Sequence, residues 1–198
     1  MISVYKIKPA FQKLLQPLMN GLYKMGVTPN AITVFSVLFS FGIGVLVYYH
    51  PWKPYFLLLV PAGLLLRMVF NALDGMMAKQ HNMQSKLGEV LNELGDVLSD
   101  LFIILPFVVS PYLAKGWVFL FAFLAVINEF AGVLGKAMGG ERRYEGPMGK
   151  SDRTLFIGLF CLLTYFWKGF WQFQNEAFIG AIVLVIISTT IRIVKGVK

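Results

Sequence analysis

Two stretches decide how this chain folds: "NALDGMMAK" at Asn71–Lys79 and "NELGDVLSD" at Asn92–Asp100. Each places acidic and amide side chains in or beside strongly apolar runs. An ionisable side chain inside a membrane is costly and by default marks a functional site. The two stretches therefore predict a hydrophobic bundle that is built around a polar site.

The composition places this chain in a membrane. Of its 198 residues, 57% are hydrophobic and only 14% are charged, whereas soluble domains carry about 25% charged residues. Several apolar runs approach the ~20 residues that cross a bilayer. We expect one domain, 1–198, with an N-terminal segment at 1–26 and a helical bundle at 27–198. The fold class is an all-α integral membrane protein.

The apolar runs predict six transmembrane helices. The "TPN" before the first run is a helix-start signal, and Pro111 follows the third. The expected spans are Ala31–Tyr49, Tyr55–Ala78, Leu87–Val109, Trp117–Met138, Thr154–Trp167 and Ala177–Val194.

The basic residues predict the orientation of these spans. Lys53, Lys115 and Lys168 fall at one set of span ends, and Arg67 falls inside a span. All the other Lys and Arg residues fall at the opposite ends, which the positive-inside rule assigns to the cytoplasm. Both termini are then cytoplasmic. The net charge of +8 indicates contact with a membrane surface; the basic residues form no separate domain that would bind nucleic acid.

The N-terminal segment is expected to lie on the membrane surface. Lys6, Lys8 and Lys13 alternate with apolar clusters there, and no small-residue cleavage site follows an apolar core. This pattern is typical of an amphipathic interfacial helix and unlike a signal peptide.

Helical spacing brings the polar residues of the two opening stretches onto facing surfaces. Arg67, Asn71 and Asp74 share one face of the second span, and Asn92, Asp96 and Asp100 form a stripe on the third. The connecting loop is short, so these helices should be antiparallel neighbours. Facing carboxylates repel each other unless a cation neutralises them. Oxygen ligands alone favour Mg²⁺, Mn²⁺ or Ca²⁺ over zinc. The alternative is a buried ion-pair network, for instance between Arg67 and Asp74.

The same residues resemble a long family signature. The CDP-alcohol phosphotransferase (phosphatidyltransferase) family has the pattern D-x2-D-G-x2-A-R-x8-G-x3-D-x3-D. The matching residues here are Asn71, Asp74, Gly75, Ala78, Lys79, Gly88, Asn92 and Asp96. The spacing agrees throughout, with Asn in two Asp positions and Lys in place of Arg. "TPNAIT", Thr28–Thr33, also resembles the family's segment before its first span.

The resemblance implies an activity and a set of roles. Family enzymes move a substituted phosphate from a CDP-linked donor, commonly CDP-diacylglycerol, to a small polar alcohol and release CMP. They work as homodimers in bacterial or archaeal cytoplasmic membranes. One or two Mg²⁺ or Mn²⁺ ions would be held by Asn71, Asp74, Asn92 and Asp96, and Asp96 would also be the catalytic base. The nucleotide-binding residues would be Asn30, Thr33, Gly75, Ala78, Lys79 and Gly88.

The two Asn residues leave three alternatives open. Glu93 or Asp100, close to the same face, could supply the missing charge. The site could hold one metal ion firmly, or the transferase reaction could be lost. We expect the activity to be retained, because the spacing, the glycines and Asp96 are intact.

The polar loop at 139–155 is expected to receive the acceptor alcohol, with or without a phosphate group. Arginine suits bidentate contacts with phosphate, while a basic flank that binds lipid headgroups is the alternative. The expected acceptor-binding residues are Arg67, Arg142, Arg143, Lys150 and Arg153. Glu129, in the fourth span, would pair with Arg67 or line the pocket.

Two other functions compete with this interpretation. One is a relative that uses another pair of CDP-alcohol and acceptor. The other is a catalytically impaired binding or transport protein whose acidic face forms an ion pathway. A transporter should show paired broken helices in repeated halves, a pattern that the sequence does not contain.

Overall fold

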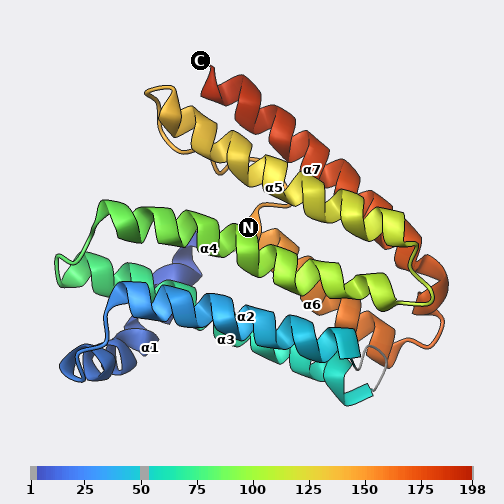
Figure 1. The fold of residues 1–198 in the computed structure, drawn as a ribbon, viewed down its shortest axis with the longest axis horizontal. Coiled ribbons are helices and arrows are strands. Elements are labelled where there is room, and N and C mark those ends of the chain that lie inside the picture. Colours follow the sequence, from blue (N-terminus) through green and yellow to red (C-terminus); the bar gives the residue numbers. More distant parts are fainter. Residues whose placement is uncertain (1–3, 50–53, 198) are drawn as a thin grey trace. The chain divides into compact units, whose positions relative to one another are not determined.

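The computed structural model describes the backbone of residues 4–49 and 54–197 and the side chains of 11–49, 55 and 57–197. Lys53, Lys198 and the side chains of Lys6 and Lys8 lie outside the described residues. Within these ranges the chain is helical and contains no strand (Figure 1). The α-helices are α1 Val4–Lys24, α2 Pro29–Tyr49, α3 Pro54–Gln80, α4 Lys86–Ile104, α5 Lys115–Ala137, α6 Lys150–Phe166 and α7 Gln174–Gly196. Two 3₁₀ segments are η1 Leu105–Val109 and η2 Phe170–Phe173.

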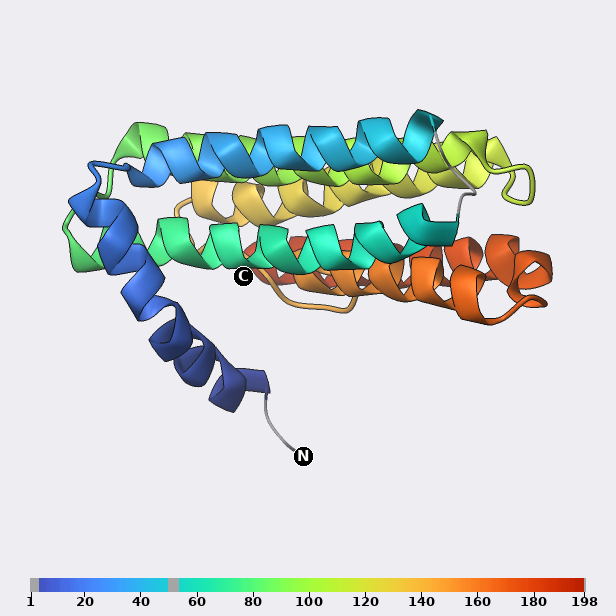
Figure 2. The same ribbon diagram turned by 90° about the horizontal axis from the view of Figure 1, so that it is seen from below.

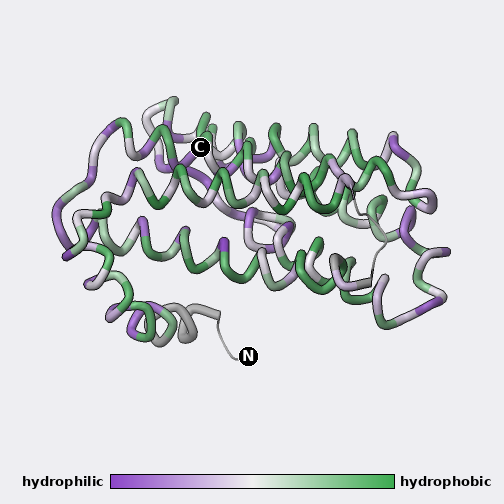
Figure 3. The backbone as a smooth tube through the Cα atoms, turned by 60° about the horizontal axis from the view of Figure 1, so that its bottom comes forward, coloured by the Kyte–Doolittle hydropathy of each residue, from purple (hydrophilic) through white to green (hydrophobic). Residues whose placement is uncertain are grey.

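Four of the described helices are long and apolar enough to cross a membrane. They lie at Pro29–Tyr49, Leu57–Gln80, Lys115–Ala137 and Phe170–Gly196. Hydrophobic residues follow the helices, and the more polar ones gather in connecting segments (Figure 3). This protein is therefore an integral membrane protein. α4 carries several acids and α6 is only 17 residues long, so the count of six spans stays a prediction.

The helix starts and ends follow local sequence signals. Thr28 Oγ1 accepts a hydrogen bond from the backbone N–H of Ala31 at 3.2 Å, with Pro29 at the first helical position. The C-terminal end of α3 is closed by Asn82, whose backbone lies in the left-handed region. A hydrogen bond from Met83 N–H to the Ala78 carbonyl accompanies it. α1 and α5 end in the same way on glycines. This motif satisfies carbonyl groups that helix ends leave without partners.

The third predicted span was wrong in one respect, because α4 stops five residues before Val109. Pro106 has no N–H to donate to the Phe102 carbonyl, so the α-helix gives way to η1. The Phe102 carbonyl instead faces Gly44 of α2 so closely that a Cβ at this glycine would lie 2.1 Å from the oxygen. Glycine is needed at residue 44 for this approach.

By its contacts the chain divides into two compact units. Unit 1 comprises Met1–Phe39 and Leu65–Asp96, and unit 2 comprises Ser40–Leu64 and Val97–Lys198. The expectation of a single domain stays a prediction.

Unit 1 has its own hydrophobic core, in which α1 packs on the last turns of α3. The buried cluster consists of Leu15, Met19, Ile32, Leu73, Met76 and Met77. At its edge, Gln16 and Gln80 exchange side-chain hydrogen bonds of 2.6 and 3.0 Å, and Tyr23 stacks on His81 at 3.5 Å. Figure 2 shows α1 crossing the direction of α2 at a steep angle. α1 is thus fixed to the end of the helix that carries the signature.

Unit 2 is centred on α5 and α7, which lie side by side (Figure 1). Val118, Phe121, Phe178 and Val185 are fully buried between them. Phe160 of α6 meets Phe178 edge to face at 5.3 Å. These aromatic contacts hold α6 against the pair, so that the start of α6 also has a defined position.

Candidate functional site

The signature residues of α3 are oriented by hydroxyl groups on α2. Asp74 is only 4% exposed, and its Oδ2 accepts a hydrogen bond of 2.7 Å from Thr33 Oγ1. One turn earlier, Asn71 Oδ1 accepts a bond of 3.1 Å from Ser36 Oγ. Groups that orient ligand side chains in this way are typical of metal sites. The sequence did not predict either contact, although "TPNAITVFS" places both hydroxyls one turn apart.

The α4 half of the signature is less buried. Asn92, Glu93 and Asp96 are half-buried, and Glu89 is exposed. The backbone oxygen of Asp96 lies 3.5 Å from Nη2 of Arg67, a side chain that is itself buried in unit 1. The interior position of Arg67 agrees with a structural role, and its predicted contact with an acceptor stays a prediction.

The glycines of the signature differ in what they allow. A Cβ at Gly88 would lie 2.8 Å from Asn30 Oδ1, so this glycine lets the start of α4 approach α2. Ser85 Oγ caps this start by accepting from Gly88 N–H at 3.0 Å. Gly75, by contrast, is exposed, and a Cβ there would meet nothing within 4 Å. Such open space is expected at a position that leaves room for a ligand. Ala78 is half-buried and Lys79 is exposed.

The four side chains that were predicted to hold a metal offer only oxygen ligands. Asp74 and Asp96 would supply two carboxylates, and Asn71 and Asn92 would supply amide oxygens. Among the residues that the structure describes, no three His, Cys, Asp or Glu side chains form a group that could hold a metal. The four side chains still fit Mg²⁺ or Mn²⁺, which take carboxylate and carbonyl oxygens.

Asp100 is engaged in unit 2. Its carboxylate accepts a 2.8 Å bond from Arg153 Nε and lies 2.7 Å from Nη2 of the same residue. Both side chains are buried. Of the two acids that could substitute for a missing ligand, Asp100 is therefore held in a buried ion pair, in which two guanidinium nitrogens meet its Oδ2, whereas Glu93 is half-buried beside the signature.

Glu129 of α5 joins the same buried cluster. Its carboxylate binds Arg153 at 2.7 Å, Arg142 at 2.8 Å and Arg192 at 3.4 Å. Beside it, the Asn128 side chain accepts from Arg153 and donates to Thr189. The sequence had offered Arg67 as a partner of Glu129 or a place for Glu129 in the pocket lining, whereas the ion pairs that the structure gives are with these three other arginines.

The loop that was expected to receive the acceptor folds back onto unit 2. Arg143 N–H bonds the Gly132 carbonyl at 3.0 Å, and the Glu145 carbonyl accepts from Ser188 Oγ and Arg192 Nε. The pKa of the Glu145 carboxyl lies below its usual range, because the carboxylate accepts backbone hydrogen bonds from Glu145 and Tyr144. Small residues on α5 leave room for the backbone of this loop to pack against the helix.

Of the basic residues predicted to bind the acceptor, Arg67 and Arg153 are each only 2% exposed. Arg142 lies over the Tyr144 ring at 4.2 Å, Arg143 lies 3.7 Å from Glu145, and Lys150 is half-buried. Arg192, which the sequence treated only as a basic flank, is 1% exposed. Its spacing from Ser188 and Thr189 on an apolar helix was the signal for a buried polar face.

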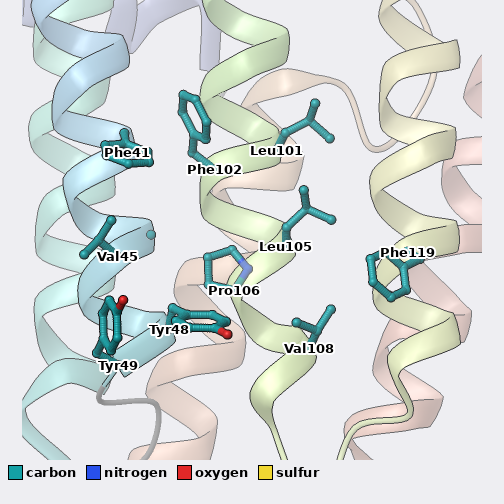
Figure 4. Close-up of a pocket in the computed structure, with 11 residues that line it drawn as sticks. Phe41, Val45, Tyr48, Tyr49, Leu101, Phe102, Leu105, Pro106, Val108 and Phe119 are labelled. Carbon is teal, nitrogen blue, oxygen red and sulfur yellow. The ribbon is translucent and has the colours of Figure 1, made fainter.

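Unit 2 also has an apolar groove of about 380 Å³ (Figure 4). Its lining comes from α2, α4, η1 and α5 and consists of Phe41, Gly44, Val45, Tyr48, Tyr49, Leu101, Phe102, Leu105, Pro106, Val108 and Phe119. Such a lining accepts hydrocarbon and has no charge for a nucleotide, so the groove is not the polar site.

Comparison with known proteins identifies the family. A family model described as CDP-alcohol phosphatidyltransferase matches residues 26–191. The chain belongs to this family. It is therefore a phosphatidyltransferase enzyme, and the resemblance noted in the signature is confirmed.

The chain is also similar to two relatives. The chain is 41% identical over 174 residues to inner membrane protein YnbA of Escherichia coli (strain K12), which covers 88% of this chain and 86% of YnbA. It is 32% identical over 154 residues to an uncharacterized protein of Aquifex aeolicus (strain VF5). This match covers 75% of the present chain and 74% of the Aquifex protein.

The solved structures share the fold of this phosphatidyltransferase. Mycobacterium tuberculosis phosphatidylinositol phosphate synthase with CDP-DAG bound is similar with a TM-score of 0.77 and 17% identity, over 93% of this chain and 94% of that one. The same enzyme in complex with manganese and citrate gives a TM-score of 0.76 and 17% identity, over 92% and 88%.

Proposed function

We propose that this phosphatidyltransferase moves a phosphatidyl group from CDP-diacylglycerol to a small polar alcohol. The acceptor hydroxyl oxygen forms a bond to the phosphorus that carries the diacylglycerol. The bond from this phosphorus to the bridging oxygen breaks, and CMP leaves. The observation that carries the proposal is the family match over residues 26–191, which includes every signature position.

The metal ligands in this proposal are Asn71, Asp74, Asn92 and Asp96. A bound divalent ion would neutralise the diphosphate oxygens and assist the departure of CMP. Two carboxylates balance the charge of one such ion, so we expect the protein alone to hold one ion tightly. A second would require the diphosphate of the donor as an additional ligand.

Asp96 is the proposed base. It lies in the α4 half of the signature, half-buried, where an incoming alcohol can reach it. A base must come within hydrogen-bond distance of the hydroxyl proton that it removes. In this reaction the proton passes from the acceptor oxygen to the Asp96 carboxylate as the new phosphate ester forms.

The nucleotide is proposed to bind beside Gly75 and Gly88. Gly75 has open space around it, and Asn30 is held next to Gly88. Lys79 is exposed one turn after Gly75, where an ammonium group can contact phosphate. Arg142, Arg143 and Lys150 are the basic residues proposed to face the acceptor.

In the membrane we propose six spans, α2 to α7, with both termini in the cytoplasm and α1 on the surface. Leu14 and Leu18, which share a face of α1, are 75% and 50% exposed and suit burial among lipid headgroups. Cys161 is buried, so cysteines introduced at Lys24 and Lys115 can be labelled selectively. The proposal requires labelling from opposite sides of the membrane. A homodimer is also part of the proposal, to be tested by crosslinking in lipid.

The reaction is tested by incubating the purified protein with CDP-diacylglycerol, Mn²⁺ and a panel of alcohols while CMP release is measured. We expect acceptor-dependent CMP release that Asp74→Asn abolishes and Glu89→Gln, at an exposed acid on the same unit, leaves intact. CMP release only with another CDP-alcohol would redirect the proposal to a different donor. An absence of CMP with every donor and acceptor would refute it.

A further inference from the structure

Three arginines of unit 2 converge on a single buried carboxylate. Glu129 is 4% exposed. Its Oε1 lies 2.7 Å from Arg153 Nη2 and 3.4 Å from Arg192 Nη1, and its Oε2 lies 2.8 Å from Arg142 Nη2. Three guanidinium groups around one pair of oxygens form a geometry that also binds a phosphate group.

Contacts other than Glu129 hold two of these arginines in place. Arg153 Nε donates to Asp100 at 2.8 Å, and its Nη1 donates to the Met148 carbonyl at 3.0 Å. Arg192 Nη1 donates to the Asn128 carbonyl at 2.8 Å. The guanidinium groups thus have anchors of their own. An anion that replaced the Glu129 carboxylate would meet a positioned set of donors.

The charges of the cluster show what the carboxylate does there. Arg142, Arg153 and Arg192 carry three positive charges, and Asp100 and Glu129 carry two negative ones. Buried charges are costly unless they are paired, and Glu129 is the acid that all three arginines share. While it stays in place, its carboxylate fills the position of an oxyanion and repels any second anion.

We propose that Glu129 is a built-in anion that determines acceptor specificity: it occupies the position that a phosphate would take, so the acceptor alcohol carries no phosphate group. This inference rests on the proposed transferase function. Asp100, which shares Arg153 with Glu129, lies one helical turn after Asp96 on α4. Asp100 is thus the member of the cluster that α4, the helix of the proposed base, contributes.

The anion site can be tested by binding alone. Glu129→Gln keeps the shape of the side chain and removes its charge. We expect inorganic phosphate to raise the melting midpoint of this variant, with an apparent affinity at least about tenfold tighter than for the unaltered protein, at constant ionic strength in chloride. Glu145→Gln removes a partly exposed carboxylate from the same unit and should gain no such site.

Two results of this experiment would overturn the inference. One is a Glu129→Gln protein whose melting midpoint phosphate does not raise. The other is an unaltered protein that binds phosphate as tightly as the variant. If Glu129→Gln accumulates folded only when phosphate is present during purification, the expected binding is already demonstrated. Failure to fold with and without phosphate, while Glu129→Asp folds, would show a purely structural acid and would also overturn it.

The specificity is tested with matched pairs of acceptors, such as glycerol and glycerol 3-phosphate, in the CMP-release assay. We expect the unphosphorylated member to be preferred at least about tenfold in kcat/KM. Glu129→Gln should lower this preference by reducing KM for the phosphorylated member. A preference of the unaltered protein for phosphorylated acceptors would refute the inference and leave the transferase function standing. CMP release with no acceptor at all would instead count against the transferase function.

Discussion

Thr33 Oγ1 donates a 2.7 Å hydrogen bond to Asp74 Oδ2, and this contact ties α2 to the signature on α3. Both side chains are buried. The bond sets the direction of the Asp74 carboxylate. A short contact between two helices therefore orients one of the two carboxylates in the proposed metal site.

Replacing this hydroxyl should weaken metal binding without unfolding the protein. Thr33→Val preserves the branched shape and removes the donor. Loss of a group that orients a ligand typically lowers metal affinity about 10–100-fold, and we expect this range for Mn²⁺ by calorimetry. Thr190→Val is the control, because Thr190 is exposed and its hydroxyl bonds the Ile186 carbonyl of its own helix. Equal Mn²⁺ affinity in both variants would contradict the role given to Thr33.

The two Asn residues should limit the number of metal ions. With carboxylates at only two of the four ligand positions, we expect about one Mn²⁺ per chain without donor. The double variant Asn71→Asp, Asn92→Asp restores two charges and should bind about two. Electron paramagnetic resonance of bound Mn²⁺ counts the ions directly. A stoichiometry that the double variant leaves unchanged would show that these positions are not ligands.

Asp96 should be required for the chemical step. Asp96→Asn removes the proposed base, and we expect kcat to fall about 100-fold or more. Because Asp96 is also a proposed metal ligand, kcat is measured at saturating Mn²⁺ and CDP-diacylglycerol. Glu89→Gln, at an exposed acid of the same helix, is the matched control. A kcat that Asp96→Asn leaves intact would exclude Asp96 as the base.

Gly44 should be intolerant of any side chain. A Cβ there would lie 2.1 Å from the Phe102 carbonyl oxygen, so Gly44→Ala must push α2 and α4 apart. Overpacking of this kind costs about 1–3 kcal/mol. Gly42→Ala, on the same helix with nothing within 4 Å, should melt at or above the temperature of the unaltered protein. Both variants are compared in the same detergent. Equal melting temperatures would contradict the role given to Gly44.

The sequence predicted the helices well where the signals are local. Thr28 caps α2 and Pro29 begins it, as "TPN" indicated. Pro106 ended α4 early because a missing N–H acts within one turn, yet the apolar run around it continues to Val109. Hydrophobic patterning alone does not predict that break.

The candidate site was predicted in part, for a similar reason. The signature spacing locates Asp74 and Asp96, but it does not show which hydroxyls orient them. The cluster around Glu129 joins residues that are far apart in the sequence, such as Glu129 and Arg192, 63 positions apart. The basic loop was expected to stay open toward an acceptor. It packs on α5 because Gly132 and Gly135 leave room for its backbone, a contact that no local pattern reveals.

The central claim is that a phosphatidyl group moves as a unit from the donor to the alcohol. It is tested most directly with CDP-diacylglycerol labelled at the phosphorus that bears the diacylglycerol, in the presence of Mn²⁺ and the active acceptor. The account predicts that the label appears in a new lipid that contains the acceptor, while the released CMP is unlabelled. Label in a water-soluble product, or no new labelled lipid with any acceptor, would contradict it.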